Sequence, residues 1–247
     1  MNINRIALKR ESKVLIAAAR PSPVAITFGY IVIVYIISGL QTRLDERFTS
    51  FVKGIWMFMR GAAPWPAFHF SSVMLFSALF IILLRIISSV LTTGYQWYSL
   101  RLSRSLNTSF SNIFDPMNTL FKVVGLTIAI AVLTFLWSLL FIIPGIVAGY
   151  SYRQAYYILY DHPEYGILQC IRESRRMMRG YKLDLFVLDL SFLGWYIVCG
   201  LTLGILFIWK MPYFEVTYAG YYNALRAMTG YGPGAEQSGG DPWDRPL

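Results

Sequence analysis

Four ionisable residues lie within or beside long apolar runs of this sequence: Arg85, Arg153, Asp189 and Glu215. A charged side chain inside a bilayer is costly, so each is a candidate for a binding site or a buried ion pair. At about 1.5 Å of rise per residue, Arg85 and Asp189 fall at matching depths, which predicts a pair between them. The alternative is that Arg85 extends to the lipid headgroups and Asp189 sits at the interface. Arg153 lies nearest mid-membrane, and Glu215 could reach it at a less well matched depth. We expect Arg153 to line any polar cavity.

A second cluster joins two carboxylates and a histidine in the segment Asp161-His162-Pro163-Glu164. Beside a membrane, this combination could perform acid and base chemistry, as in a lipid-cleaving hydrolase. The same spacing is that of a capping box, with Asp161 as the cap, Glu164 three residues on and Pro163 in the first turn. We favour the capping box, and we expect it to begin an amphipathic helix over residues 164–180 that ends at Gly180.

Positive charge is concentrated on this predicted helix and just after it. Bases at the inner face of a membrane are attracted to anionic headgroups. We therefore expect lipid-headgroup contacts from Arg172, Arg175, Arg176, Arg179 and Lys182.

No residue pattern indicates a metal or a cofactor. The chain has two cysteines and two histidines, and none of them is at metal-ligand spacing. The sequence also lacks a nucleotide-binding glycine loop, a nucleophile elbow and an HExxH motif. We expect no metal site, no cofactor and no enzymatic activity.

The composition places these residues in a membrane protein. Of 247 residues, 56% are apolar and only 14% are charged, and the mean hydropathy is +0.50. Soluble domains have about 25% charged residues, so a slightly larger core cannot explain the deficit. The formal net charge is +9. Because the bases lie between apolar runs and form no single soluble patch, the expected partner is a lipid bilayer with anionic headgroups and not nucleic acid.

The apolar runs predict an all-α fold, a polytopic transmembrane helix bundle of about six spans arranged as three helical hairpins. The membrane domain covers residues 23–229, with spans near 24–40, 70–91, 123–143, 145–159, 185–204 and 212–228. The last two share one apolar stretch, which we expect to break at residues 209–212. Interfacial amphipathic helices are expected in the basic segment 1–22 and within 41–69. Residues 230–247 are expected to form a disordered cytoplasmic tail.

The distribution of bases indicates the orientation of these spans. With the N-terminus inside, the inner segments carry fifteen Lys and Arg residues and the outer segments carry five. This ratio follows the positive-inside rule. We therefore expect a multi-pass protein of the cytoplasmic membrane with both termini in the cytoplasm.

Each of three spans that run inward contains a Gly-Tyr pair followed shortly by an arginine. The pairs are Gly94-Tyr95, Gly149-Tyr150 and Gly220-Tyr221, and the arginines are Arg101, Arg153 and Arg226. Common ancestry of three hairpins would explain the pattern. The alternative is that glycine permits close helix packing and tyrosine favours interfaces. The seventeen tyrosines and seven tryptophans gather at predicted span ends, as in an aromatic belt, with an aromatic substrate cavity as the alternative.

Motifs of the C-terminal half occur in the order and spacing of a known family. They include Ile143-Pro144-Gly145-Ile146, Asp161-His162-Pro163-Glu164, Met178-Arg179-Gly180 and the segment from Asp189 to Trp195. From about residue 140 to 227 the chain resembles the domain-of-unknown-function family numbered 975, small multi-pass membrane proteins common in Firmicutes. The resemblance implies a helical cytoplasmic-membrane protein of Gram-positive type. It implies no reaction, ligand or active site.

Together these features predict a non-enzymatic integral membrane protein that acts in transport or as an envelope accessory factor. The accessory role would involve a membrane-protein partner or a homo-oligomer, and the transport role a ligand whose identity the sequence does not reveal. Two alternatives remain open. One is a lipid-modifying enzyme that uses the cluster from Asp161 to Glu164, and the other is a passive helix bundle that binds anionic lipid.

Overall fold

The structure is a computed structural model that describes residues 3–62 and 72–230, with the side chains of 43–55 and 72–77 left out of the description. Within these ranges the chain is helical apart from its connections, and it contains no strand. The predicted all-α fold is confirmed. The predicted tail lies outside the described residues from 231 onward, as does the part of the predicted 70–91 span before residue 72.

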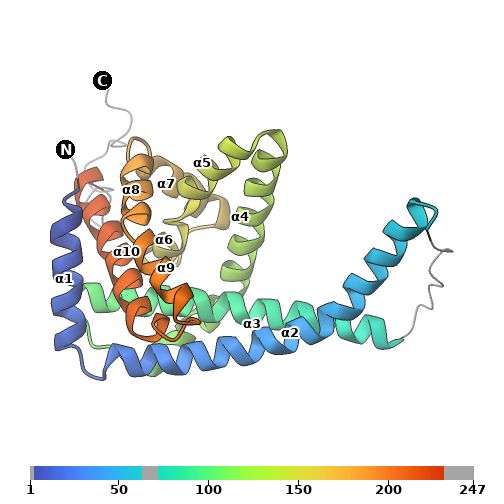
Figure 1. Cartoon of the computed structure of the whole chain (residues 1–247). Coiled ribbons are helices and arrows are strands. Elements are labelled where there is room, and N and C mark those ends of the chain that lie inside the picture. The colour runs from blue at the N-terminus through green and yellow to red at the C-terminus, as the bar shows by residue number, and fades with distance from the viewer. Residues whose placement is uncertain (1–2, 63–71, 231–247) are drawn as a thin grey trace.

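The chain forms ten α-helices and one 3-10 helix within the described residues (Figure 1). In order they are α1 Arg5–Ala18, α2 Pro23–Met59, α3 Ser72–Ser103, η1 Phe110–Thr119, α4 Leu120–Leu140, α5 Ile142–Tyr152, α6 Ala155–Asp161, α7 Ile167–Met177, α8 Lys182–Leu190, α9 Leu193–Leu201 and α10 Phe207–Thr229.

Four described segments are long and apolar enough to cross a membrane. They are Pro23–Thr42, Ala78–Ser103, Phe110–Leu140 and Lys182–Leu201. These correspond to four of the six predicted spans. The predicted span 145–159 is divided between α5 and α6, and α10 carries Lys210, Glu215 and Arg226 in its 23 residues. The composition and these helices make the chain a membrane protein, while the number of six spans stays a prediction.

Helix α2 is longer than the predicted span, because it continues to Met59 without a break. The separate interfacial helix expected within 41–69 is therefore wrong, since no proline interrupts the segment before residue 60. At about 1.5 Å per residue, α2 is about 55 Å long, well above the roughly 30 Å thickness of a bilayer core. Both α2 and α3 extend beyond the other helices, and they run across the direction of α1 and α4 until the far part of α2 turns away from α3 (Figure 1).

The connection before α10 also differs from the prediction. The turn lies at residues 202–206, and Gly204 in this turn has a left-handed backbone with φ of +84°. The break expected at residues 209–212 is wrong, because α10 continues through Pro212. As the sixth residue of α10, Pro212 has no N–H and removes one intrahelical hydrogen bond, but it does not end the helix. The glycine, which adopts positive φ at little cost, decided the turn.

Helix α10 packs against α1, α2 and α3, so it lies at the centre of the described chain. Its Tyr221 and Tyr222 are fully buried, as are Tyr95 and Tyr98 of α3. These tyrosines form part of the core, so the expected aromatic belt does not account for them. Of the three predicted hairpins, α2 with α3 and α4 with α5 pack directly. The third hairpin meets through aromatic side chains, with Phe192 4.8 Å from Phe214 between ring centroids.

The basic segment predicted over 1–22 forms α1, and its buried stripe packs on the protein. Leu8 and Ser12 are buried against α10, where the Thr217 hydroxyl donates to the Ser12 hydroxyl at 3.1 Å. Lys9 donates to the Ser191 hydroxyl at 2.6 Å, and Arg5 lies 3.6 Å from Asp184. This side of α1 is therefore used by α10 and α8 and is not available to lipid.

Candidate functional site

The turn between α5 and α6, at residues 153–154, places Arg153 beside α8. The Arg153 Nη1 lies 2.6 Å from the Asp189 Oδ2, and the Tyr150 hydroxyl donates to the same oxygen at 2.8 Å. The Arg153 guanidinium also lies 4.2 Å from the ring centroid of Tyr218. The second carboxylate oxygen, Asp189 Oδ1, is buried and has no hydrogen-bond partner among the described residues. The structure thus brings the predicted Arg153 and Asp189 together in one polar cluster, where their side chains are 36% and 23% exposed.

The predicted pair between Arg85 and Asp189 is wrong, because Asp189 is bonded to Arg153. Arg85 is exposed on α3. Helix α8, which carries Asp189, packs on α5. Depth in a membrane is only one coordinate of a side chain, and the choice of neighbouring helices decides which charges of similar depth meet.

A groove of about 570 Å³ lies between α2 and the region of α9 and α10. Its lining is apolar and aromatic except for Ser38 and Glu215, and Glu215 is the one charged residue in it. The lining residues are Tyr30, Ile31, Val34, Tyr35, Ser38, Tyr196, Leu203, Gly204, Phe207, Met211, Phe214 and Glu215. Within the described chain, the Glu215 carboxylate forms no hydrogen bond and no ion pair. The predicted approach of Arg153 to Glu215 is therefore not a direct contact, since Arg153 bonds to Asp189.

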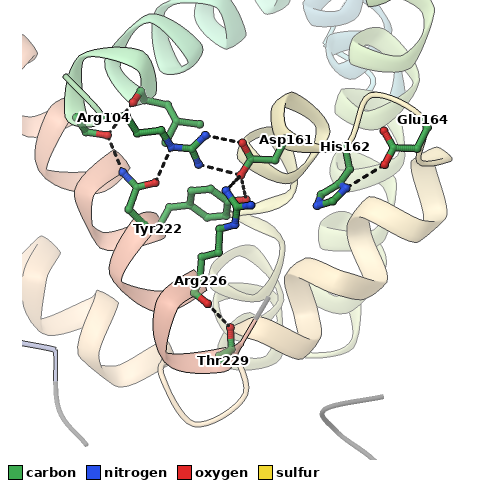
Figure 2. Close-up of polar contacts among 10 residues, drawn as sticks. Arg104, Asp161, His162, Glu164, Tyr222, Arg226 and Thr229 are labelled. Atoms are coloured by element: carbon green, nitrogen blue, oxygen red, sulfur yellow. Dashed lines mark hydrogen bonds and ion pairs between the residues drawn. The ribbon is translucent and has the colours of Figure 1, made fainter. Parts of the chain in front are cut away.

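A second polar cluster, the Asp161 cluster, joins the ends of α3, α6 and α10 (Figure 2). Arg104 donates to both carboxylate oxygens of Asp161, at 2.6 and 2.8 Å. Arg226 and the Tyr222 hydroxyl donate to Asp161 Oδ2 at 2.9 and 2.7 Å. Asn223 accepts from Arg104 at 3.0 Å and donates to the Ser103 hydroxyl at 2.9 Å. A bidentate arginine holds a carboxylate in fixed geometry, so this cluster ties three helices together.

The charge state of Asp161 follows from these neighbours. Burial alone would raise the pKa of Asp161, since its side chain is only 6% exposed. Hydrogen bonds from Arg104 and Tyr222, together with the positive charges of Arg104 and Arg226, outweigh burial and lower the pKa below its ordinary value. Asp161 is ionised at neutral pH.

The comparisons with known proteins give one match. A family described as "Protein of unknown function (DUF975)" matches residues 69–229. The chain belongs to this family. The curated proteins and the solved structures contain no match to it.

The matched range of this DUF975 protein includes both polar clusters. It contains Arg104, Arg153, Asp161, Asp189 and Glu215, and it excludes α1 and α2. The α2 wall of the groove therefore lies outside the range, and the α9–α10 wall lies inside it.

The capping box predicted for this DUF975 protein is wrong. Asp161 is the last residue of α6, and α7 begins only at Ile167 after Gly166. His162 Nδ1 lies 2.9 Å from Glu164 Oε1 (Figure 2). The His162 ring also stacks on Tyr165, with 4.5 Å between the ring centroids. The predicted helix 164–180 is thus shorter, and Gly180 has a φ of +85° after the helix has ended. Asp161 does not cap α7 because the two arginines and Tyr222 bind its carboxylate.

The predicted headgroup residues lie on and after α7. Arg172, Arg175 and Arg179 are exposed, Arg176 lies 3.3 Å from Glu173, and Lys182 is half-buried. Arg175 and Lys182 also line a pocket of about 140 Å³ with residues of α4 and α5. The three exposed arginines are free to meet an anionic surface, and their contact with lipid stays a prediction.

The described residues contain no group of three His, Cys, Asp or Glu side chains that could hold a metal ion. Cys170 and Cys199 are both buried and unpaired with one another. These thiols are part of the apolar packing.

Sequence reasoning missed Arg104, Tyr222 and Arg226 as site residues. The sequence contained a signal for Arg226, because an arginine follows each of the three Gly-Tyr pairs. Each of the arginines after a Gly-Tyr pair forms an ion pair with an aspartate: Arg101 with Asp115 at 3.3 Å, Arg153 with Asp189 at 2.6 Å and Arg226 with Asp161 at 2.9 Å. No comparable signal marks Arg104, whose partner is 57 residues away in sequence.

Proposed function

We propose that this DUF975 protein is a non-enzymatic protein of the cytoplasmic membrane that acts in transport, with both termini in the cytoplasm. It would bind a small solute in the interior next to Arg153, Asp189 and Glu215. One observation carries the proposal: the groove of about 570 Å³ is lined by a glutamate that has no ion-pair partner among the described residues. Such a charge in an apolar membrane interior is costly unless it serves binding or transfer.

An enzymatic role has less support. The lipid-modifying alternative needs the two carboxylates of the segment 161–164 to act as acid and base. Asp161 is occupied by Arg104, Arg226 and Tyr222, and the lowered pKa leaves it a weak base at neutral pH. His162 Nδ1 lies 2.9 Å from Glu164 Oε1, and covalent catalysis would need a nucleophile beside that base.

An accessory or lipid-binding role is the second candidate. It is favoured by three exposed arginines on α7 and just after it, Arg172, Arg175 and Arg179. Each base near an anionic surface contributes about 1 kcal/mol at physiological salt. This role needs no solute, so an experiment with solutes separates it from transport.

The test is ligand-dependent thermal stabilisation of the purified full-length protein against a panel of small solutes. Transport predicts that at least one solute raises the Tm and that Arg153→Ala abolishes the rise. Arg85→Ala is the matched control, because Arg85 is exposed and does not bond to Asp189. Arg153→Lys is the substitute test if Arg153→Ala folds poorly. It keeps the positive charge, so it is expected to retain part of the solute-dependent rise in Tm.

The opposite result is a wild-type protein whose Tm no solute changes. If a membrane protein then co-purifies, the accessory role replaces transport. If anionic lipid alone stabilises the protein and added salt removes this effect, the passive lipid-binding role replaces it.

A further inference from the structure

We infer that the groove between α2 and the α9–α10 region binds a lipophilic monocation, which is an apolar body with one positive charge, and that Glu215 is its counter-ion. This inference rests on the proposed function and names the class of solute. It is drawn from three properties of the groove: its size, its aromatic walls and the balance of charge around Glu215.

The size of the groove suits a small organic molecule. Ligand pockets have volumes of about 300–1,000 Å³, and this groove has about 570 Å³. Its lining residues come from α2 on one wall, and from α9, α10 and the turn between them on the other. A solute that partitions into the bilayer could enter from the lipid, since Tyr35 is 78% exposed and Leu203 is 93% exposed.

Aromatic side chains form both walls. Tyr30 and Tyr35 line the α2 wall, and Tyr196 and Phe214 line the other. The Tyr196 and Phe214 rings are 4.9 Å apart, and Tyr30 stacks on the fully buried Tyr95 at 4.5 Å, so three of these four rings have aromatic neighbours that hold them. Aromatic faces attract cations through their quadrupole. They also accept the apolar body of the same molecule.

The charges beside the groove favour a cation over an anion. Arg153 bonds to Asp189, so its positive charge is balanced by that carboxylate. The formal charges of Arg153, Asp189 and Glu215 sum to −1. Lys210, the cation nearest to Glu215 in sequence, lies over the ring of Trp195 at 3.9 Å. A bound monocation would neutralise this region, whereas a neutral solute would leave Glu215 without a counter-ion.

The experiment compares two probes of nearly the same shape and opposite charge, tetraphenylphosphonium and tetraphenylborate. Equilibrium binding of each to the purified full-length protein is measured in neutral detergent. We expect tetraphenylphosphonium to bind at least tenfold more tightly than tetraphenylborate. We expect Glu215→Gln to weaken tetraphenylphosphonium binding at least tenfold and Glu215→Asp to retain most of it.

Two further variants separate the site from general effects on folding. Glu11→Gln removes a carboxylate from an exposed position on α1 and is expected to leave binding unchanged. Val34→Trp fills the groove from α2 while keeping Glu215, and it is expected to abolish binding. Each variant is compared with wild type by its Tm and its elution volume.

The inference is overturned if tetraphenylborate binds as tightly as tetraphenylphosphonium, or if Glu215→Gln leaves the affinity for the cation unchanged. It is also overturned if neither probe binds. The proposed function fails on a different observation, namely that no solute of any charge changes the Tm. If an anion binds and its binding depends on Arg153, the inference is overturned and the proposed function still holds.

Discussion

The contacts of Asp161 in the structure differ from those that its neighbours in sequence predict. Beside His162 and Glu164 it resembles a catalytic or capping carboxylate. In the structure it accepts hydrogen bonds from Arg104, Arg226 and Tyr222, which come from α3 and α10. Removing one member of a buried ionic cluster leaves the other charges uncompensated. The role that follows is structural.

We predict that Asp161→Asn destabilises the protein by about 2–3 kcal/mol, because Arg104 and Arg226 lose their shared carboxylate. This is below the range for fully buried pairs, since the arginine side chains are 22% and 21% exposed. The measurement is unfolding of the purified protein in detergent. Asp115→Asn is the control, because the Arg101–Asp115 pair is 30% and 33% exposed and should contribute about 0–1 kcal/mol. Equal losses in the two variants would contradict the prediction.

The stability difference between wild type and Asp161→Asn should depend on pH, and the pKa of Asp161 gives the sign. The pKa of Asp161 is lowered in the folded protein from an ordinary value of 3.8, so its contribution is fully present above that value. It is lost as the pH falls through the lower, folded value. The difference in Tm between wild type and Asp161→Asn should therefore be constant near neutral pH and shrink below about pH 4. A difference that shrinks already between pH 7 and pH 6 would assign the effect to another group.

At the scale of elements, the Gly-Tyr pairs show that one sequence pattern can have different physical causes. Gly94 of α3 lies against η1, where an added Cβ would overlap the backbone carbonyl of Ile113. Gly149 of α5 has no atom within 4 Å of the same position, and Gly220 of α10 has only the Leu8 side chain at 3.5 Å. Close packing explains the first glycine and leaves the second unexplained. The three pairs therefore share a pattern without sharing a contact.

We predict opposite effects of alanine at two of these glycines. Gly94→Ala should destabilise the protein by about 1–3 kcal/mol, because the backbone of η1 must move. Gly149→Ala should stabilise it by about 0.5–1 kcal/mol, because alanine is the better helix former and meets nothing. Both are measured as shifts in Tm. Destabilisation by Gly149→Ala would contradict the prediction.

At the scale of the whole molecule, the number of spans decides where the basic α7 lies. Four and six spans both place the two termini on one side, so the termini do not distinguish them. If only the four long apolar segments cross, the α7 arginines lie outside when the N-terminus is inside. The positive-inside rule disfavours that arrangement. Six spans, with α5–α6 and α10 crossing as well, return α7 to the inner face.

We therefore predict opposite accessibility for two single cysteines in a Cys170→Ala, Cys199→Ala background. Leu168→Cys on α7 and Leu203→Cys before α10 are suitable because these leucines are 72% and 93% exposed. A membrane-impermeant maleimide should label position 203 in intact cells and position 168 only after permeabilisation. The reverse pattern would support four spans, and labelling of both from one side would show that α8–α9 does not cross.

The sequence alone determined the class of this protein, because apolar composition and helical periodicity are local properties. The helices α1 and α7, the α4–α5 hairpin and the membrane character follow from such patterns, and so does the choice of Arg153 and Asp189 as candidate site residues. Length and composition could not show that α2 continues to Met59 or that Gly204, and not Pro212, makes the last turn. Those boundaries depend on small differences in free energy between neighbouring turns.

Only the tertiary structure decided which charges meet. Arg153 and not Arg85 pairs with Asp189, and Asp161 binds two distant arginines. Glu215 lines the groove without an ion pair among the described residues. Ion pairing falls steeply with distance, and distance across a bundle depends on helix neighbours and on rotation about each axis. A linear sequence records depth along a helix but neither of these two coordinates. The partners of the interior charges were therefore beyond sequence reasoning, although the residues themselves were not.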